Sequence, residues 1–151
     1  MQDGASLRDA EPVFRAIIEG GGVFTLHPRG ASMRPTIVPG RDSVSVVRLD
    51  GEPRRYDILL YRRQNGQFVL HRVARVKKGR YTMCGDNQVV FERGICHSDV
   101  VGVVSVIHRP CGDLVRGTRP FVRVAAKRAW NRPLRRVRYL LATLYHRVCG
   151  K

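Results

Sequence analysis

Six short segments with alternating apolar and polar residues constrain the fold of this chain most. They are rich in β-branched residues, and a period of two is typical of strands with one buried face. The segments are Val23–Leu26, Ser43–Val47, Asp57–Tyr61, Phe68–Val76, Tyr81–Met83 and Val100–Ile107. The pattern predicts a mainly β body.

The pair Asn65-Gly66 separates the third and fourth of these segments. This pair tolerates the positive φ angles of a tight hairpin turn, so the two segments are expected to be antiparallel neighbours. Alternation along the second strand then places His71 on the same face as Val69 and Val73. His71 is therefore expected on a rigid strand, flanked by valines.

Helical patterns flank the β body. At the N-terminus, Asp9 is a candidate N-cap for a short helix with Pro12 in its first turn, ending at Gly20. After Pro120 a helical pattern begins, is interrupted at 131–133, and resumes with an apolar stripe of Leu134, Val137, Leu141, Leu144 and Val148. We expect an N-terminal helix in 1–22, a β domain in 23–112 and a basic helical tail in 113–151.

The positive charge is concentrated in that tail. The formal net charge is +16, and residues 116–151 contain eleven Lys or Arg and no Asp or Glu. The other 115 residues carry 17 basic and 12 acidic side chains, a net charge of about +5. A basic amphipathic tail favours an anionic membrane surface or a protein partner, whereas binding of nucleic acid is not expected.

The composition also narrows the cellular location and the chemistry. No segment approaches the ~18 consecutive apolar residues of a membrane span, and acidic residues in the first 25 positions do not fit a secretory signal. The four cysteines, Cys84, Cys96, Cys111 and Cys149, lack paired spacing, which favours reduced thiols and a cytoplasmic protein, peripheral at the membrane at most. Cys96-His97 and His108-x-x-Cys111 match no common zinc pattern, so no metal or cofactor is expected.

Four sequence blocks occur in a suggestive order. They are Gly30-Ala31-Ser32-Met33-Arg34-Pro35-Thr36, Asp57-Ile58-Leu59, Leu70-His71-Arg72-Val73, and Gly85-Asp86-Asn87 followed by Glu92. Together, over about residues 20–108, they resemble the S24/S26 serine peptidase superfamily. The first block looks like the nucleophile segment of signal peptidase I. The His-Arg-Val block looks like the endoplasmic-reticulum and archaeal branch, where His replaces the Lys base.

These residue types suit acyl transfer. A serine hydroxyl is a poor nucleophile at neutral pH, so a neutral imidazole must take its proton as attack proceeds. Ser32 and His71 fit these roles. A carboxylate behind the imidazole would fix its tautomer, and both Glu92 and Asp86 are candidates.

The resemblance favours Glu92, because in the His-type branch the orienting acid lies six residues after the Asp of the Gly-Asp-Asn motif. Asp86 would then hold a turn near the site. The Ser32 backbone amide is the expected oxyanion donor. The other supporting positions that the resemblance implies are Gly30, Met33, Pro35 and Asn87.

Four positions depart from the family pattern. Gly30 stands where many relatives place an oxyanion-binding Ser, which implies weaker activity. Cys84 replaces a frequent Lys, Tyr56 replaces the usual Gly before Asp57, and Arg41 interrupts a Gly-Asp pair. The N-terminal membrane anchor of signal peptidases is not found in this sequence, so anchoring falls to the basic tail in this interpretation.

The expected fold is a coiled antiparallel β-sheet like that of signal peptidase and LexA. The expected activity is a serine endopeptidase that processes an extended signal-like or leader-like peptide. Two alternatives are a self-cleaving repressor-like regulator and a peptide-binding module with a decayed site. Each residue also has an ordinary structural explanation: Ser32 as a turn serine, His71 as a strand histidine, and Glu92 as one half of an exposed charge pair with Arg93.

Overall fold

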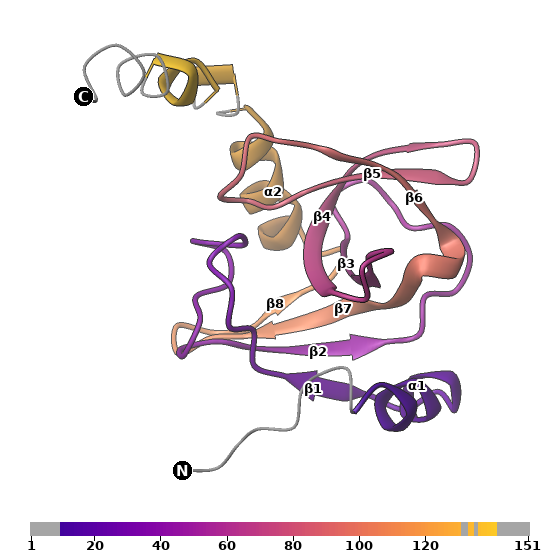
Figure 1. The fold of residues 1–151 in the computed structure, drawn as a ribbon. Coiled ribbons are helices and arrows are strands. Elements are labelled where there is room, and N and C mark those ends of the chain that lie inside the picture. The colour runs from indigo at the N-terminus through magenta and orange to yellow at the C-terminus, as the bar shows by residue number, and fades with distance from the viewer. Residues whose placement is uncertain (1–9, 131–132, 135, 142–151) are drawn as a thin grey trace, which may run out of the picture.

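The alternating segments form one eight-stranded antiparallel sheet in the computed structural model, which describes residues 10–130, 133–134 and 136–141 (Figure 1). The strands are β1 (Phe24–Leu26), β2 (Ser43–Val47), β3 (Ile58–Arg62), β4 (Phe68–Lys77), β5 (Arg80–Cys84), β6 (Glu92–Cys96), β7 (Val100–His108) and β8 (Leu114–Val115). Their order is β1-β2-β7-β3-β4-β5-β6, and β8 pairs with β7. The prediction of a mainly β body is confirmed.

The hairpin at Asn65-Gly66 is confirmed as well. Strands β3 and β4 are antiparallel, with Arg62 opposite Phe68, and Gly66 has a φ of 79°. The sheet is curved, with β2 and β7 on one side and β5 and β6 on the other (Figure 1). Side chains of β3 alternate between two cores, because Leu60 joins one buried cluster and Leu59 the other.

Strands β6 and β8 were not predicted. The residues of β6 are only partly buried, since this strand forms an edge of the sheet, and they show no apolar alternation. Strand β8 has two residues and lies within the range 113–151 that was expected to be a helical tail. Glu92 is the first residue of the unpredicted strand β6.

The helices lie outside the sheet. Helix α1 (Glu11–Glu19) has Pro12 in its first turn and ends at Gly20, and it lies beside β1 (Figure 1); the proposed cap Asp9 lies outside the described residues. A single 3-10 turn, η1 (His97–Asp99), precedes β7. Helix α2 (Arg119–Trp130) buries Phe121 and Ala125. Residues 133–134 and 136–141 are helical too, while Leu144 and Val148 lie outside the described part.

None of the helices that the structure describes is long and apolar enough to cross a membrane. Within the described residues, Cys84, Cys96 and Cys111 form no disulfide bond. Cys149 lies outside the described residues.

Candidate active site

The segment that carries Ser32 is anchored in the core by its neighbours. Met33 and Ile37 are buried in the larger hydrophobic cluster, and the Ile37 N–H donates to the Met33 carbonyl at 3.0 Å. Ser32 is half-buried, whereas Gly30 and Pro35 are exposed. Two apolar anchors therefore fix the backbone while Ser32 stays at the surface.

The loop after β5 holds the backbone of Ser32 from the other side. The Asn87 N–H donates to the Ser32 carbonyl oxygen at 2.7 Å. A Cβ atom at Gly85 would lie 2.6 Å from the same oxygen, a distance that real Cβ atoms do not adopt. Gly85 is thus needed for the close approach of the two chains.

Asp86 connects the Ser32 segment to β4. Its carboxylate accepts hydrogen bonds from Thr36 Oγ1 at 2.5 Å, Arg72 Nε at 2.8 Å and Arg72 Nη2 at 2.7 Å. The side chain of Asp86 is 0% exposed and that of Arg72 is 2% exposed. Since Arg72 follows His71 directly, this buried ion pair fixes strand β4 relative to the Ser32 loop.

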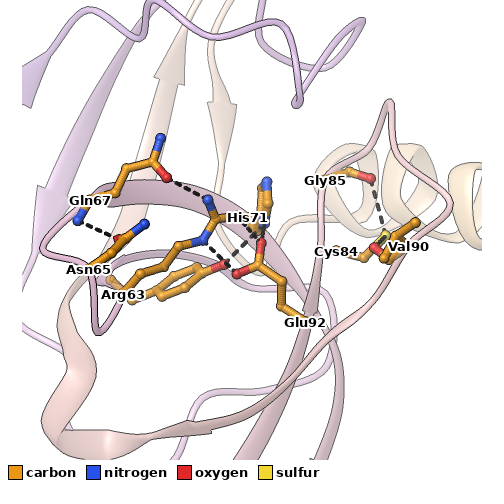
Figure 2. A network of polar contacts seen from close by, with 9 residues as sticks. Arg63, Asn65, Gln67, His71, Cys84, Gly85, Val90 and Glu92 are labelled. Atoms are coloured by element: carbon orange, nitrogen blue, oxygen red, sulfur yellow. Dashed lines mark hydrogen bonds and ion pairs between the residues drawn. The ribbon is translucent and has the colours of Figure 1, made fainter.

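His71 is oriented by two groups at one ring nitrogen. Its Nδ1 lies 3.0 Å from Glu92 Oε1 and 3.1 Å from the Tyr61 hydroxyl oxygen (Figure 2). A carboxylate only accepts, so the Nδ1–H donates to Glu92 and Nε2 is left as an acceptor. Nε2 lies on the side of the ring away from Glu92 (Figure 2).

Glu92 itself is held by several donors. Arg63 donates from Nε to Oε2 at 2.8 Å and from Nη2 to Oε1, a bidentate contact. Burial would raise the pKa of Glu92, but the hydrogen bonds from Arg63 and Tyr61 and the proximity of His71 together lower that pKa below its usual value. Glu92 is therefore ionised at neutral pH.

The imidazole of His71 is neutral under the same conditions. Its side chain is 2% exposed, and this burial lowers the pKa of His71 against the opposing effect of Glu92. A buried neutral imidazole with a fixed tautomer can accept a proton at Nε2. This is the property that a general base needs.

Among the described residues, no hydrogen bond joins Ser32 to His71, and neither the hydroxyl nor the amide N–H of Ser32 has a hydrogen-bond partner. Both Ser32 groups are therefore available to a ligand. Catalytic hydrogen bonds are often long without substrate and tighten when substrate binds.

A groove with a volume of about 530 Å³ opens next to this arrangement. The groove is lined by three groups of residues: Asn87–Val90 in the loop after β5, the ion pair of Arg63 and Glu92, and Arg138 and Tyr139 in the C-terminal helical residues. A chain lying in the groove would pass beside Glu92.

A second serine–histidine–aspartate arrangement is formed by Ser45 on β2, His108 at the end of β7 and Asp113 in the connection between β7 and β8. Ser45 Oγ is 2.8 Å from His108 Nε2, and His108 Nδ1 is 3.0 Å from Asp113 Oδ2. However, Ser45 is 6% exposed and lies in the middle of β2, paired on both sides with β1 and β7. Because Ser45 is buried, its hydroxyl offers little accessible surface to a substrate carbonyl in this structure.

Sequence reasoning missed two members of the site, Tyr61 and Arg63. Tyr61 pairs with Val69, which makes it a diagonal neighbour of His71 on the same face, so the register of the hairpin would have revealed it. Arg63 has no such signal, because its position depends on the course of the connection between β3 and β4. Within the described residues, no group of three or more His, Cys, Asp or Glu side chains could hold a metal ion.

No family model matches the chain, and no curated protein matches it.

Proposed function

We propose that this chain is a serine endopeptidase of the signal peptidase type, with Ser32 as nucleophile, His71 as general base and Glu92 as the acid that orients His71. One observation carries the proposal: the Nδ1 contact with Glu92 leaves Nε2 of a buried, neutral His71 as a proton acceptor. The Asp86 bridge supports it, since it fixes the strand of His71 relative to the loop of Ser32.

The backbone supports the resemblance to the S24/S26 superfamily at two positions. Tyr56 has a φ of 80°, in the left-handed region that glycine adopts freely, and glycine is the residue that the resemblance places before Asp57. Gly85, the first residue of the Gly-Asp-Asn motif, is required by the close approach of the Ser32 carbonyl. The curved antiparallel sheet is also the architecture that the resemblance implies.

The proposed reaction uses these groups in order. The Ser32 oxygen attacks the peptide carbonyl while Nε2 of His71 takes the hydroxyl proton, and the Ser32 amide N–H donates to the developing oxyanion. The C–N bond then breaks as His71 gives the proton to the leaving amine, leaving an acyl ester on Ser32. Water, deprotonated by His71, hydrolyses that ester and restores the serine.

The substrate we propose is an extended peptide segment, signal-like or leader-like, with small residues near the cleaved bond as the resemblance implies. The groove beside Glu92 is not lined by Ser32 or His71, so we propose that it holds a part of the peptide away from the cleaved bond. Strand β6 is an edge strand to which an extended chain can pair.

We also propose that the C-terminal helices face an anionic membrane surface. Arg119, Arg123 and Lys127 lie on the exposed side of α2, opposite the buried Phe121 and Ala125. In the following helical residues the exposed apolar side chains are flanked by basic ones; the apolar set is Leu134, Val137, Leu140 and Leu141, and the basic pair is Arg136 and Arg138. Anionic headgroups would complement this charge while the leucines enter the interface.

The endopeptidase activity is tested with purified protein and synthetic leader-like peptides, followed by mass spectrometry of the products. The native protein and Ser45→Ala are expected to cleave the peptides, whereas Ser32→Ala is expected to be inactive. Ser45→Ala is a matched control, because it removes a serine that contacts a histidine, His108, away from the Ser32 segment. Equal cleavage by the native protein and Ser32→Ala would remove the proposal.

A further inference from the structure

We infer that Arg63 is a positioning residue for His71 that acts through Glu92, fixing where the Glu92 carboxylate lies and compensating its negative charge. The inference deepens the proposed function and rests on it, since it concerns how the proposed base is set. Neither the sequence blocks nor the resemblance assigns any role to Arg63.

The geometry of the contact is that of a two-point clamp. Arg63 donates to both carboxylate oxygens of Glu92, from Nε to Oε2 at 2.8 Å and from Nη2 to Oε1. Of these two oxygens, Oε1 lies 3.0 Å from Nδ1 of His71. Rotation of the carboxylate would break one Arg63 bond, so the clamp selects the orientation in which Oε1 accepts from His71.

Arg63 is in turn fixed by the hairpin from which it projects. Its remaining terminal nitrogen, Nη1, donates to Gln67 Oε1 at 2.6 Å, and the Gln67 N–H donates to Asn65 Oδ1 at 3.0 Å (Figure 2). The chain of contacts therefore runs from the β3–β4 connection through Arg63 and Glu92 to His71. In it, Gln67 contacts Arg63, Arg63 contacts Glu92, and Glu92 contacts His71 through side-chain atoms.

Charge is the second part of the role. The groups that act on His71 are Glu92 on β6, Tyr61 on β3, Asp86 in the loop after β5, and Arg63 after β3. After burial, which dominates, Glu92 raises the pKa of His71 and Arg63 lowers it. Without Arg63 the negative charge of Glu92 is uncompensated, and the ring holds its proton to higher pH.

The test is an NMR titration of the His71 ring in the full chain, with the signal assigned by its loss in His71→Gln. We expect the His71 midpoint to move to higher pH in Arg63→Gln. It should stay in place in Arg62→Gln, a matched control in which an exposed neighbouring arginine with a looser contact to Glu11, at 3.6 Å, loses its charge. Peptide cleavage at pH 7 should fall on the order of 10- to 100-fold in Arg63→Gln, because a shift of about 1 Å in a positioned group has effects of that size.

Two further variants separate charge, orientation and simple folding. Arg63→Lys keeps the charge but loses the two-point contact, so its His71 midpoint should stay near that of the native protein while kcat falls. Gln67→Ala removes the hairpin contact of Arg63 without removing the contact to Glu92, so it should cause a smaller loss than Arg63→Gln. If Arg63→Gln does not fold, Arg63→Lys and Gln67→Ala still give these results.

Three results would overturn the inference: an unchanged His71 midpoint in Arg63→Gln, a titration of Arg62→Gln identical to that of Arg63→Gln, or an Arg63→Lys protein that matches the native one in both midpoint and kcat. The titration needs no substrate and so does not depend on the peptidase activity. If the peptides are not cleaved while the midpoint moves as expected, the proposed function fails and the electrostatic link between Arg63 and His71 stands.

Discussion

Replacing Asp86 by Asn tests the link between the Ser32 loop and the His71 strand. The side chain of Asp86 is 0% exposed and accepts from Thr36 Oγ1 and from two nitrogens of Arg72. The substitution keeps the shape and one acceptor oxygen, but it leaves the Arg72 guanidinium buried without a counter-charge. Arg72 Nη1 still donates to the Tyr56 carbonyl at 2.8 Å, and this contact does not compensate the charge.

The expected loss follows from the burial of the pair. Removing one partner of a buried ion pair costs about 3–5 kcal/mol, and the retained acceptor places this case near the lower end, at about 3 kcal/mol. For a chain of this length, each kcal/mol lowers Tm by roughly 2–4 °C. We therefore expect Tm to fall by roughly 6–12 °C.

The free energy of unfolding is measured by urea unfolding and Tm by thermal unfolding, both at pH 7 and followed by circular dichroism, with Asp113→Asn as the control. The Asp113 side chain is 50% exposed and contacts only a half-exposed His108, so its loss should cost no more than about 1 kcal/mol. The double variant Asp86→Asn with Arg72→Met should recover part of the loss, since it removes the unpaired buried charge. A cost for Asp86→Asn equal to that of Asp113→Asn would refute the reasoning.

Three further predictions concern activity and membrane binding. Burial lowers the pKa of His71, and only the neutral ring accepts the Ser32 proton. We therefore expect kcat/KM to rise with pH and to be half-maximal at a pH below the ordinary histidine pKa of about 6.5. A flat profile from about pH 5 to 8 would contradict this. A Cβ at Gly30 would meet no atom within 4 Å, so a serine side chain should fit there and add an oxyanion donor. We expect Gly30→Ser to raise kcat about tenfold or more and Gly30→Ala to give no gain. Equal rates for the two variants would exclude a missing oxyanion donor at this position. The affinity for phosphatidylserine vesicles, measured by co-sedimentation, should fall about 30-fold in the double variant Arg136→Gln with Arg138→Gln, because each charge contributes about 1 kcal/mol. The native protein should not bind phosphatidylcholine vesicles. Equal binding to both lipids would exclude the proposed surface.

The fold was predictable where burial on one face imposes a pattern. The six alternating segments are strands because one side of each packs into a core, and Asn65-Gly66 marks a hairpin because its turn needs positive φ. Strands β6 and β8 carry no such pattern. β6 lies at the sheet edge, partly buried, and β8 has only two residues, so both depend on their partners β5 and β7.

Candidate site residues could be chosen from the sequence where the order of motifs carries information. Ser32, His71, Asp86 and Glu92 were singled out in this way, and the structure brings His71 and Glu92 into contact and joins the Ser32 loop to Asp86. It does not place a hydrogen bond between Ser32 and His71 within the described residues.

Other contacts depend on the register of the paired strands and on the path of the loops. The alternation of apolar and polar residues determines neither. Arg63 reaches Glu92 across 29 positions, and Ser45 reaches His108 across 63. For both pairs, the sequence shows the residues but not their contact.

Labelling with a serine-directed fluorophosphonate, mapped by mass spectrometry of the peptides, tests the central claim most directly. We predict a single adduct on Ser32, formed faster as pH rises through the pKa of His71, and no adduct in His71→Ala. Labelling of Ser45, labelling of Ser32 at an unchanged rate in His71→Ala, or no adduct at all would contradict the account.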